Sequence, residues 1–221
     1  MKLQEICSKT KLRLNVIESV LTGRGLGVRR EATSLWIHGD SREALDVLRG
    51  NVDAVVADPP YGINYVPGES AQHKFGGVAI EGDDRPFDPR PFLDVAAISL
   101  FWGANHFAPR LPASPGWLVW DKRCGRGRNN QADCELAWTS RRRVARLKHR
   151  EWNGANRGSE RGEHHHPTQK SVEVMAWCLD ELELPAGALV CDPFMGSGTT
   201  GLACLKTGRA FVGLEIDARW Y

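Results

Sequence analysis

One short segment, "VVADPPYGINY" (residues 55–65), combines residue types that can bind a planar group carrying an N–H. An apolar run leads into Asp58 and then into Pro59 and Pro60. Because proline has no backbone N–H and cannot continue a sheet ladder, a strand must end at this point. The two prolines make a stiff corner that presents a carboxylate, carbonyl oxygens and the ring of Tyr61. Such a corner can accept hydrogen bonds from an amine.

A second segment, "CDPFMGSGTTGLAC" (residues 191–204), places Gly196 and Gly198 between a predicted strand and a predicted helix. A phosphate-binding P-loop needs a lysine directly after its last glycine, but here Thr199 follows. The dinucleotide pattern G-x-G-x-x-G is met only loosely. Glu215 ends the next predicted strand, where an acid accepts hydrogen bonds from ribose hydroxyls. The segment therefore predicts a site for an adenosine.

Three acids, Asp40, Asp192 and Glu215, stand at the predicted C-terminal ends of strands, where open α/β sheets bind ligands. Acids without a lysine repel pyrophosphate but suit a ligand that carries an ammonium and a sulfonium. S-adenosylmethionine is that ligand. The alternative, in which each acid is a helix cap or a turn residue, explains any one of them but not their joint placement.

The elements that must position these residues alternate along the chain. Apolar patterns predict strands over residues 34–40, 52–60, 99–105, 116–122, 187–194 and 210–217, and helices over 41–50, 90–98, 171–182 and 201–208. The run at 52–60 is typical of a strand that is buried on both faces of a parallel sheet. This alternation predicts an α/β fold with a doubly wound, mostly parallel sheet. The glycine-rich residues 23–28 are expected to form a linker, and the long loop after Gly62 a lid.

Positive charge is concentrated in residues 122–162, which hold 12 basic and four acidic residues, a local net charge of +8. The whole chain carries only +2. A charge run is usually a solvated surface, but this one lies between two halves of a fold with catalytic features, which favours nucleic-acid binding. The arginines predicted to contact DNA are Arg123, Arg126, Arg128, Arg141, Arg142 and Arg143.

Composition limits the classes of protein to which this chain can belong. The chain has 221 residues, 42% of them hydrophobic, which is enough for one sizeable core. Its six cysteines show no C-x-x-C pair, which favours reduced thiols in an intracellular protein. The sequence shows neither a leader nor an apolar run approaching 18 residues, so secretion and membrane spanning are not expected. The adjacent histidines 164–166 cannot face one metal as i, i+4 ligands do, so no metal is predicted.

Four motifs in one order carry a resemblance to a known family. "DPPYG" (58–62), "HPTQKS" (166–171), "DPFMGSGTT" (192–200) and "VGLEID" (212–217) resemble the amino-group DNA methyltransferases, which modify adenine N6 or cytosine N4. The D-P-P-Y box precedes the glycine turn, as in the permuted class of this family. Further segments of the sequence resemble those of phage and prophage members. The resemblance covers residues 34–221. It implies a Rossmann-like methyltransferase sheet of about seven strands with a small inserted recognition region.

The resemblance also implies roles for individual residues. Asp58 and the carbonyl of Pro59 would accept hydrogen bonds from the target amine, Pro60 would lock the corner, and Tyr61 would stack on the flipped base. S-adenosylmethionine would be held at the turn and around it. The residues implied for the cofactor are Asp40, Thr168, Asp192, Pro193, Phe194, Gly196, Ser197, Gly198 and Glu215.

These observations predict a helical extension (1–30), a catalytic half with the D-P-P-Y box (31–121), a basic recognition insertion (122–164) and a cofactor-binding half (165–221). The predicted reaction is methylation of adenine N6 in a short sequence of double-stranded DNA. Cytosine N4, an RNA target and a DNA-binding relative without turnover remain alternatives. The expected location is the cytoplasm of a bacterial or phage-infected cell, where the methyltransferases of restriction-modification systems act. A homodimer is among the oligomeric states left open.

Overall fold

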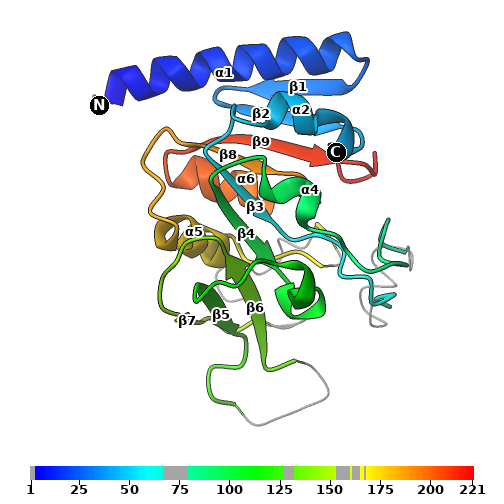
Figure 1. Ribbon diagram of the computed structural model, residues 1–221, viewed down its shortest axis with the longest axis vertical. Helices are drawn as coiled ribbons and strands as arrows, with labels where there is room; N and C mark the ends of the chain where they lie inside the picture. The colour runs from blue at the N-terminus through cyan, green and yellow to red at the C-terminus, as the bar shows by residue number, and fades with distance from the viewer. Residues whose placement is uncertain (1–2, 67–78, 127–131, 153–159, 161–164, 167) are drawn as a thin grey trace.

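The alternation of apolar strands and helices along the chain produces a nine-stranded sheet with helices against both faces (Figure 1). The computed structural model describes residues 3–66, 79–126, 132–152, 160, 165–166 and 168–221. In chain order the elements are α1 (Leu3–Gly23), β1 (Gly27–Glu31), β2 (Ser34–His38), the 3-10 helix η1 (Ser41–Ala44), α2 (Leu45–Leu48), β3 (Ala54–Ala57), α4 (Arg90–Leu93), β4 (Ile98–Trp102), the 3-10 helices η2 (Ala104–His106) and η3 (Ala108–Arg110), β5 (Trp117–Asp121), β6 (Cys134–Thr139), β7 (Arg146–His149), α5 (Val172–Glu181), β8 (Leu189–Asp192), α6 (Thr199–Lys206) and β9 (Ala210–Glu215).

The strand order in the sheet is β1-β2-β9-β8-β3-β4-β6-β5-β7. The five strands from β2 to β4 in this order are mutually parallel, so they all end at one edge, called here the carboxyl edge. β6 is antiparallel to β4 on one side and to β5 on the other. The predicted α/β fold with a doubly wound, mostly parallel sheet is confirmed, with nine strands rather than about seven.

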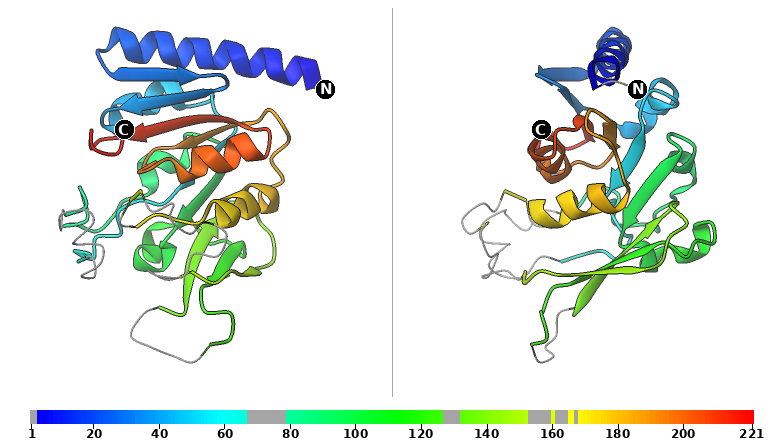
Figure 2. Two further views of the ribbon diagram at one scale, coloured as in Figure 1. Left: turned by 180° about the vertical axis from the view of Figure 1, so that it is seen from behind. Right: turned by 90° about the vertical axis from the view of Figure 1, so that its left-hand side faces the viewer.

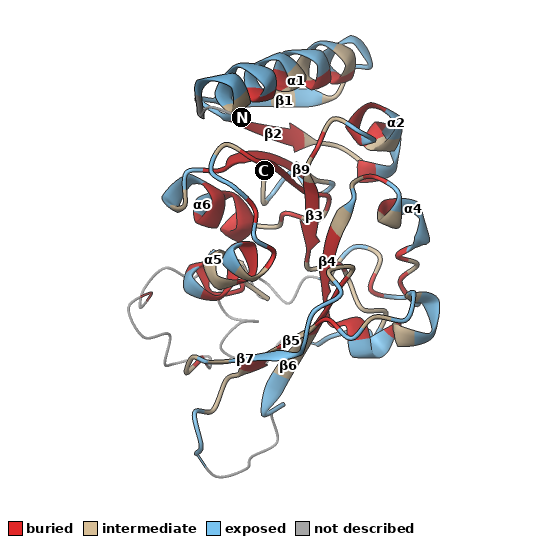
Figure 3. Ribbon diagram, turned by 60° about the vertical axis from the view of Figure 1, so that its left-hand side comes forward, coloured by how far each residue is buried: buried red, intermediate tan, exposed pale blue. Residues whose placement is uncertain are grey.

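The central strand β3 shows why its sequence is apolar throughout. Val55 and Ala57 belong to a core shared with α1, α2 and α4, whereas Ala54 and Val56 belong to a second core shared with α5 and α6. Successive side chains of a strand point to opposite faces, so a strand covered on both faces needs an apolar residue at every position. The right-hand view of Figure 2 shows the two helical layers, and Figure 3 shows the buried strands between them.

Two segments differ from the expectation. The glycine-rich residues 23–28, expected to form a linker, contain the start of β1, which pairs antiparallel with β2 beneath α1. The basic segment 122–164 supplies β6 and β7 to the main sheet. Neither β1 nor β7 has a continuous apolar face, because both lie at edges of the sheet, and this explains why periodicity missed them. Only the loops of the basic segment remain as a candidate recognition region.

None of the helices in the described ranges is long and apolar enough to cross a membrane. All six cysteines lie in the described part of the chain and are free thiols; Cys178, Cys191 and Cys204 are buried in the core.

Candidate active site

The corner after β3 is held tightly by its surroundings. The Tyr61 hydroxyl donates to Asp58 Oδ1 at 2.6 Å, and the Tyr61 ring stacks on the His106 ring with centroids 5.1 Å apart. Gly103, at the end of β4, has a φ of 65°, and a Cβ there would lie 2.0 Å from the Tyr61 ring. A glycine is therefore required at position 103 because the Tyr61 ring occupies the space of any side chain.

A buried carboxylate distant in sequence fixes the chain just beyond this corner. Asp83 accepts hydrogen bonds from the backbone N–H groups of Gly62 at 2.8 Å, Ile63 at 3.3 Å and Tyr65 at 2.6 Å. Sequence reasoning missed Asp83, because nothing in the spacing marks an acid 21 residues from Gly62 as its partner. The lid predicted after Gly62 lies largely in residues 67–78, outside the described residues.

Four charged side chains form a connected cluster that includes Asp58. Lys170 Nζ donates to Asp58 Oδ2 at 2.6 Å and to the Tyr61 hydroxyl at 3.2 Å, and lies 3.0 Å from Glu135 Oε2. Lys122 Nζ in turn donates to Glu135 Oε1 at 2.7 Å. Two lysines balance two carboxylates, as a buried charge cluster requires. Sequence reasoning did not assign Lys170, Glu135 or Lys122 to the site, although Lys170 lies inside the "HPTQKS" motif.

The cluster changes how its members titrate. Burial raises the pKa of the Asp58 carboxyl above its ordinary value, although Lys170 opposes that effect. Burial disfavours the cation of Lys170, but the charges of Asp58 and Glu135 outweigh it and hold the pKa of Lys170 well above its ordinary value. Burial works against the Glu135 anion too, yet Lys170 and Lys122 lower the pKa of Glu135 to about 2. Lys170 and Glu135 are therefore charged at neutral pH.

A cavity of about 1350 Å³ opens along the carboxyl edge and joins the corner to the glycine turn. Ten of the thirteen residues predicted for the catalytic and cofactor sites line it: Asp40, Asp58, Pro59, Pro60, Tyr61, Thr168, Pro193, Phe194, Gly196 and Glu215. The carboxyl ends of β2, β3, β8 and β9 bring them together, because all four strands are parallel. Asp192, Ser197 and Gly198 are not among the lining residues.

Asp192 lies beneath the glycine turn and is almost completely buried. Its Oδ2 accepts from the Thr200 hydroxyl at 2.5 Å, and its Oδ1 accepts from the Phe194 N–H at 3.0 Å. Burial raises the pKa of Asp192 to about 7, against these two hydrogen bonds. Both oxygens of Asp192 therefore hold the turn, and its predicted contact with the cofactor stays a prediction.

Glu215, at the end of β9, lies beside the turn and reaches the cavity. Its Oε2 accepts from the Gly196 N–H at 2.9 Å and its Oε1 from the Asp217 N–H at 2.8 Å. Burial raises the pKa of Glu215 above its ordinary value. Gly198 begins α6 with a φ of 80°, and a Cβ there would lie 2.5 Å from the Trp36 ring, so this glycine serves the packing of the turn.

Asp40 and Thr168 complete the predicted cofactor residues. Asp40 follows β2, accepts from the Arg42 N–H at 2.9 Å and forms an ion pair with the Arg42 side chain at 2.5 Å. That hydrogen-bonded pair lowers the pKa of Asp40. The Thr168 hydroxyl lies 3.1 Å from His166 Nδ1, so these two residues of the "HPTQKS" motif hold each other at the wall of the cavity.

The predicted DNA-contacting arginines divide into two groups. Arg123 and Arg126 lie in the loop after β5, next to the cavity-lining Lys122 at the carboxyl edge. Arg123 lies 3.3 Å from Asp133, and Arg126 forms an ion pair with Glu151. Arg128 lies outside the described residues.

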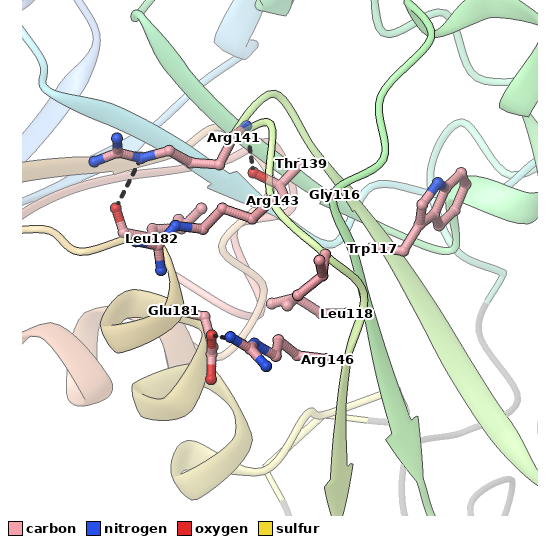
Figure 4. Close-up of a pocket in the computed structure, with 10 residues that line it drawn as sticks. Gly116, Trp117, Leu118, Thr139, Arg141, Arg143, Arg146, Glu181 and Leu182 are labelled. Carbon is pink, nitrogen blue, oxygen red and sulfur yellow. Dashed lines mark hydrogen bonds and ion pairs between the residues drawn. The ribbon is translucent and has the colours of Figure 1, made fainter.

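Arg141, Arg142 and Arg143 follow β6, which runs antiparallel and so ends at the opposite edge of the sheet. There Arg141 Nε donates to the Leu182 carbonyl at 3.1 Å (Figure 4). Arg143 pairs with Glu183, and both partners lie just beyond α5. The only reason to group these three arginines with the predicted recognition residues is the concentration of positive charge in the sequence. The topology places them at the edge opposite the cavity, and two of them contact the chain just beyond α5. Their contact with DNA stays a prediction.

Three tryptophans from β5, β6 and the chain after β7 pack in the core. Trp120, Trp138 and Trp152 are all at most 7% exposed. Trp120 and Trp152 contact each other edge to face, with ring centroids 6.0 Å apart, and both also line the cavity.

A family model described as DNA methylase, N6_N4_Mtase, matches residues 114–221. YubD of Escherichia coli (strain K12), which is described as a methylase, is 42% identical over 60 residues, 27% of this chain and 26% of that protein. The DNA adenine methyltransferase YhdJ of the same organism is 40% identical over 55 residues, 25% of this chain and 18% of that protein. The matched part of the chain thus spans about a quarter or less of these curated relatives.

Solved structures of DNA methyltransferases share the fold. The M1.HpyAVI–SAM complex is similar with a TM-score of 0.53 and 21% identity, over 84% of this chain and 94% of that one. The cytosine-N4-specific PvuII DNA methyltransferase is similar with a TM-score of 0.55 and 16% identity, over 84% and 83%. The family model thus supports the resemblance to the amino-group DNA methyltransferases over residues 114–221, and the solved structures show that the fold is shared over most of the chain.

Proposed function

We propose that this protein is an S-adenosylmethionine-dependent DNA methyltransferase of the permuted class that acts on the N6 amine of adenine. The observation that carries the proposal is the single cavity shared by the Asp58–Tyr61 corner and the glycine turn. A methyl donor held at the turn and an amine held at the corner would lie in one enclosed space. Proximity of this kind supplies much of the acceleration of a direct transfer.

The residues of the turn suit the cofactor. The carboxylates of Asp40 and Glu215 line the part of the cavity beside the turn, and they suit the amine and hydroxyl groups of an adenosine. Phe194 and Leu214 supply an apolar surface for its base. S-adenosylmethionine, when bound, provides a methyl group on a positively charged sulfur, and the turn at residues 192–200 contains no lysine to repel that charge.

The corner suits the amine. An exocyclic amine is a poor nucleophile because its lone pair is delocalised into the ring. In the proposed role, the Asp58 carboxylate and the Pro59 carbonyl accept its two hydrogens and favour a pyramidal nitrogen whose lone pair faces the methyl group. Acceptors that are already fixed stabilise the transition state without reorganisation. Pro59 and Pro60 restrict the backbone that carries them.

The target base must leave the DNA duplex to reach this cavity, which costs roughly a few kcal/mol. Stacking on Tyr61 would return about 1–3 kcal/mol. The loop after β5 carries Arg123 and Arg126 at the carboxyl edge, where they can bind phosphates and set the register. We therefore place the recognition region in the loops at this edge.

The preference for adenine over cytosine rests on two observations. The corner carries an aspartate, whereas cytosine-N4 enzymes of the resembled family more often carry serine at that position. The relative YhdJ is a DNA adenine methyltransferase by name. Cytosine N4 is the second candidate, because the amine chemistry is the same. The homodimer, the pairing with a restriction nuclease and the phage-related cytoplasmic setting stay predictions from the sequence.

Incubation of the purified protein with methyl-labelled S-adenosylmethionine and unmethylated duplex DNA, followed by nucleoside analysis, tests the proposal. Label in N6-methyldeoxyadenosine is the expected result. Label in N4-methyldeoxycytidine would correct the base and keep the reaction. A protein that binds the cofactor and DNA but transfers no label would be a DNA-binding relative without turnover, and label transferred only to RNA would change the substrate class.

A further inference from the structure

The acceptor carboxylate of the corner has two oxygens in different environments. Oδ2 of Asp58 is held by Lys170 Nζ at 2.6 Å, whereas Oδ1 is held by the Tyr61 hydroxyl at 2.6 Å. Tyr61 belongs to the wall of the cavity and is part of the machinery proposed for the base. Lys170 belongs to the chain just before α5 and approaches the other oxygen of the carboxylate.

From this geometry we infer that Lys170 is a positioning residue: it fixes Oδ2 of Asp58 so that Oδ1 faces the target amine, and Glu135 fixes Lys170 in turn. This inference rests on the proposed function, since it assigns Asp58 Oδ1 as the acceptor of the amine. Neither Lys170 nor Glu135 is given a contact with the base or the cofactor.

The surroundings of Lys170 hold its ammonium in one arrangement. Its side chain is 9% exposed. Its Nζ donates hydrogen bonds to Asp58 Oδ2 at 2.6 Å and to the Tyr61 hydroxyl at 3.2 Å, and it forms an ion pair with Glu135 Oε2 at 3.0 Å. The rings of Tyr61 and Trp102 lie within 5.9 Å of Nζ. An ammonium held by two hydrogen bonds and an ion pair acts as a fixed anchor for the carboxylate.

The groups facing Asp58 come from several elements. The cation is Lys170, and the anions are Glu135 on β6 and, more distantly, Asp192 on β8. Tyr61 donates its hydroxyl, and Lys122 after β5 neutralises Glu135. Lys170 is thus the one cation among these described groups that contacts Asp58 directly. Its removal should raise the pKa of Asp58, because only the hydrogen bond from Tyr61 would then oppose burial and the neighbouring anions.

The decisive variant is Lys170→Met, measured against Arg209→Met. Arg209 is a matched control because it is 8% exposed, pairs with Asp180 at 3.1 Å and lies before β9, at the edge opposite the cavity.

The expected result for Lys170→Met is a single-turnover rate about 100-fold lower at neutral pH. On the acidic side of the pH–rate profile, the pH at which the rate is half-maximal should rise by about 1–3 units. Cofactor affinity should stay within about twofold, since the inference assigns Lys170 no contact with the cofactor. Arg209→Met should lower stability without moving the pH profile.

Titration of the ¹³C-labelled Asp58 carboxyl by NMR gives a readout that does not depend on turnover. A rise in its pKa in Lys170→Met, and a smaller change in Glu135→Gln, supports the inference. Glu135→Gln also serves if Lys170→Met does not fold. An unchanged Asp58 titration, or a rate loss without a shift of the pH profile, overturns it. A wild-type protein that binds the cofactor but transfers no methyl group overturns the proposed function, while the titration still decides whether Lys170 holds Asp58.

Discussion

Two aspartates, the half-buried Asp58 and the fully buried Asp192, stand at the ends of neighbouring strands of the same sheet and have different surroundings. Asp58, after β3, faces the ammonium of Lys170 and lies at the wall of the cavity. Asp192, at the end of β8, faces only a hydroxyl and a backbone N–H within hydrogen-bond distance among the described residues, and it does not line the cavity. Burial raises the pKa of both carboxyls, but only Asp58 has a described cation in contact to oppose it.

The comparison teaches how one fold separates a reacting carboxylate from a structural one. A buried carboxylate that must accept hydrogen bonds from a ligand needs a cation to keep it ionised, and it must keep an atom exposed to the cavity. A buried carboxylate that shapes a turn needs only donors from the turn itself, and it can titrate near neutrality while it keeps the shape of the turn. Variants of Asp58 and Asp192 test this distinction, and two further predictions test the position of Tyr61 and the two groups of arginines.

The largest effect is expected from Asp58→Asn. The amide would present a donor where the amine needs an acceptor, so the rate of methyl transfer should fall by at least about 1000-fold. The rate is measured with labelled cofactor under saturating DNA, and cofactor affinity by calorimetry should be unchanged. A rate within about tenfold of the wild type would mean that Asp58 is not the acceptor.

The next effect is expected from Gly103→Ala. The added Cβ would lie 2.0 Å from the Tyr61 ring and would displace it, so kcat/KM for DNA should fall about 10–100-fold. Gly50→Ala is the matched control, because Gly50 has a similar φ of 73° and nothing within 4 Å of the added Cβ. Equal losses in both variants would show that backbone strain, not the position of Tyr61, causes the effect.

Asp192→Asn should have little effect on methyl transfer but should change the pH dependence of stability. The folded pKa of Asp192 is about 7 and the ordinary value is 3.8, so its ionisation lowers the stability of the wild type as pH rises between these values. Asparagine can still accept from the Phe194 N–H and can donate to Thr200. Between about pH 5 and pH 8, the free energy of unfolding of the variant should rise by roughly 2–3 kcal/mol relative to that of the wild type, measured by urea denaturation. Parallel pH profiles would show that Asp192 does not titrate in this range.

The smallest effect separates the two groups of arginines. Arg126→Ala, at the carboxyl edge, should weaken DNA binding and reduce the slope of log K against log salt by about one. Arg142→Ala, which removes an exposed arginine at the opposite edge, should change neither. The measurement is a salt titration of binding to an unmethylated duplex. A larger loss of DNA affinity in Arg142→Ala than in Arg126→Ala would show that the DNA interface lies at the opposite edge, as the charge density of the sequence predicts.

The sequence by itself determined the doubly wound sheet, because apolar runs such as residues 52–60 are dictated by burial on both faces. It also determined the corner and the turn, because proline and glycine restrict the backbone locally wherever they occur. Four motifs carried the resemblance; three of them lie in residues 114–221, which the family model matches, and the solved structures share the fold. Ten of the predicted site residues meet in one cavity because strands that run parallel end at one edge.

Only the tertiary structure decided what depends on contacts between distant residues. Lys170 reaches Asp58 from the chain before α5, Glu135 reaches Lys170 from β6, and Asp83 caps the loop after the corner, although no local pattern marks any of these pairs. The direction of β6 carried residues 141–143 away from the site, because an antiparallel strand reverses the edge at which its flanking loops lie. Charge and spacing along a chain identify residue types, whereas burial and strand direction determine which of them meet.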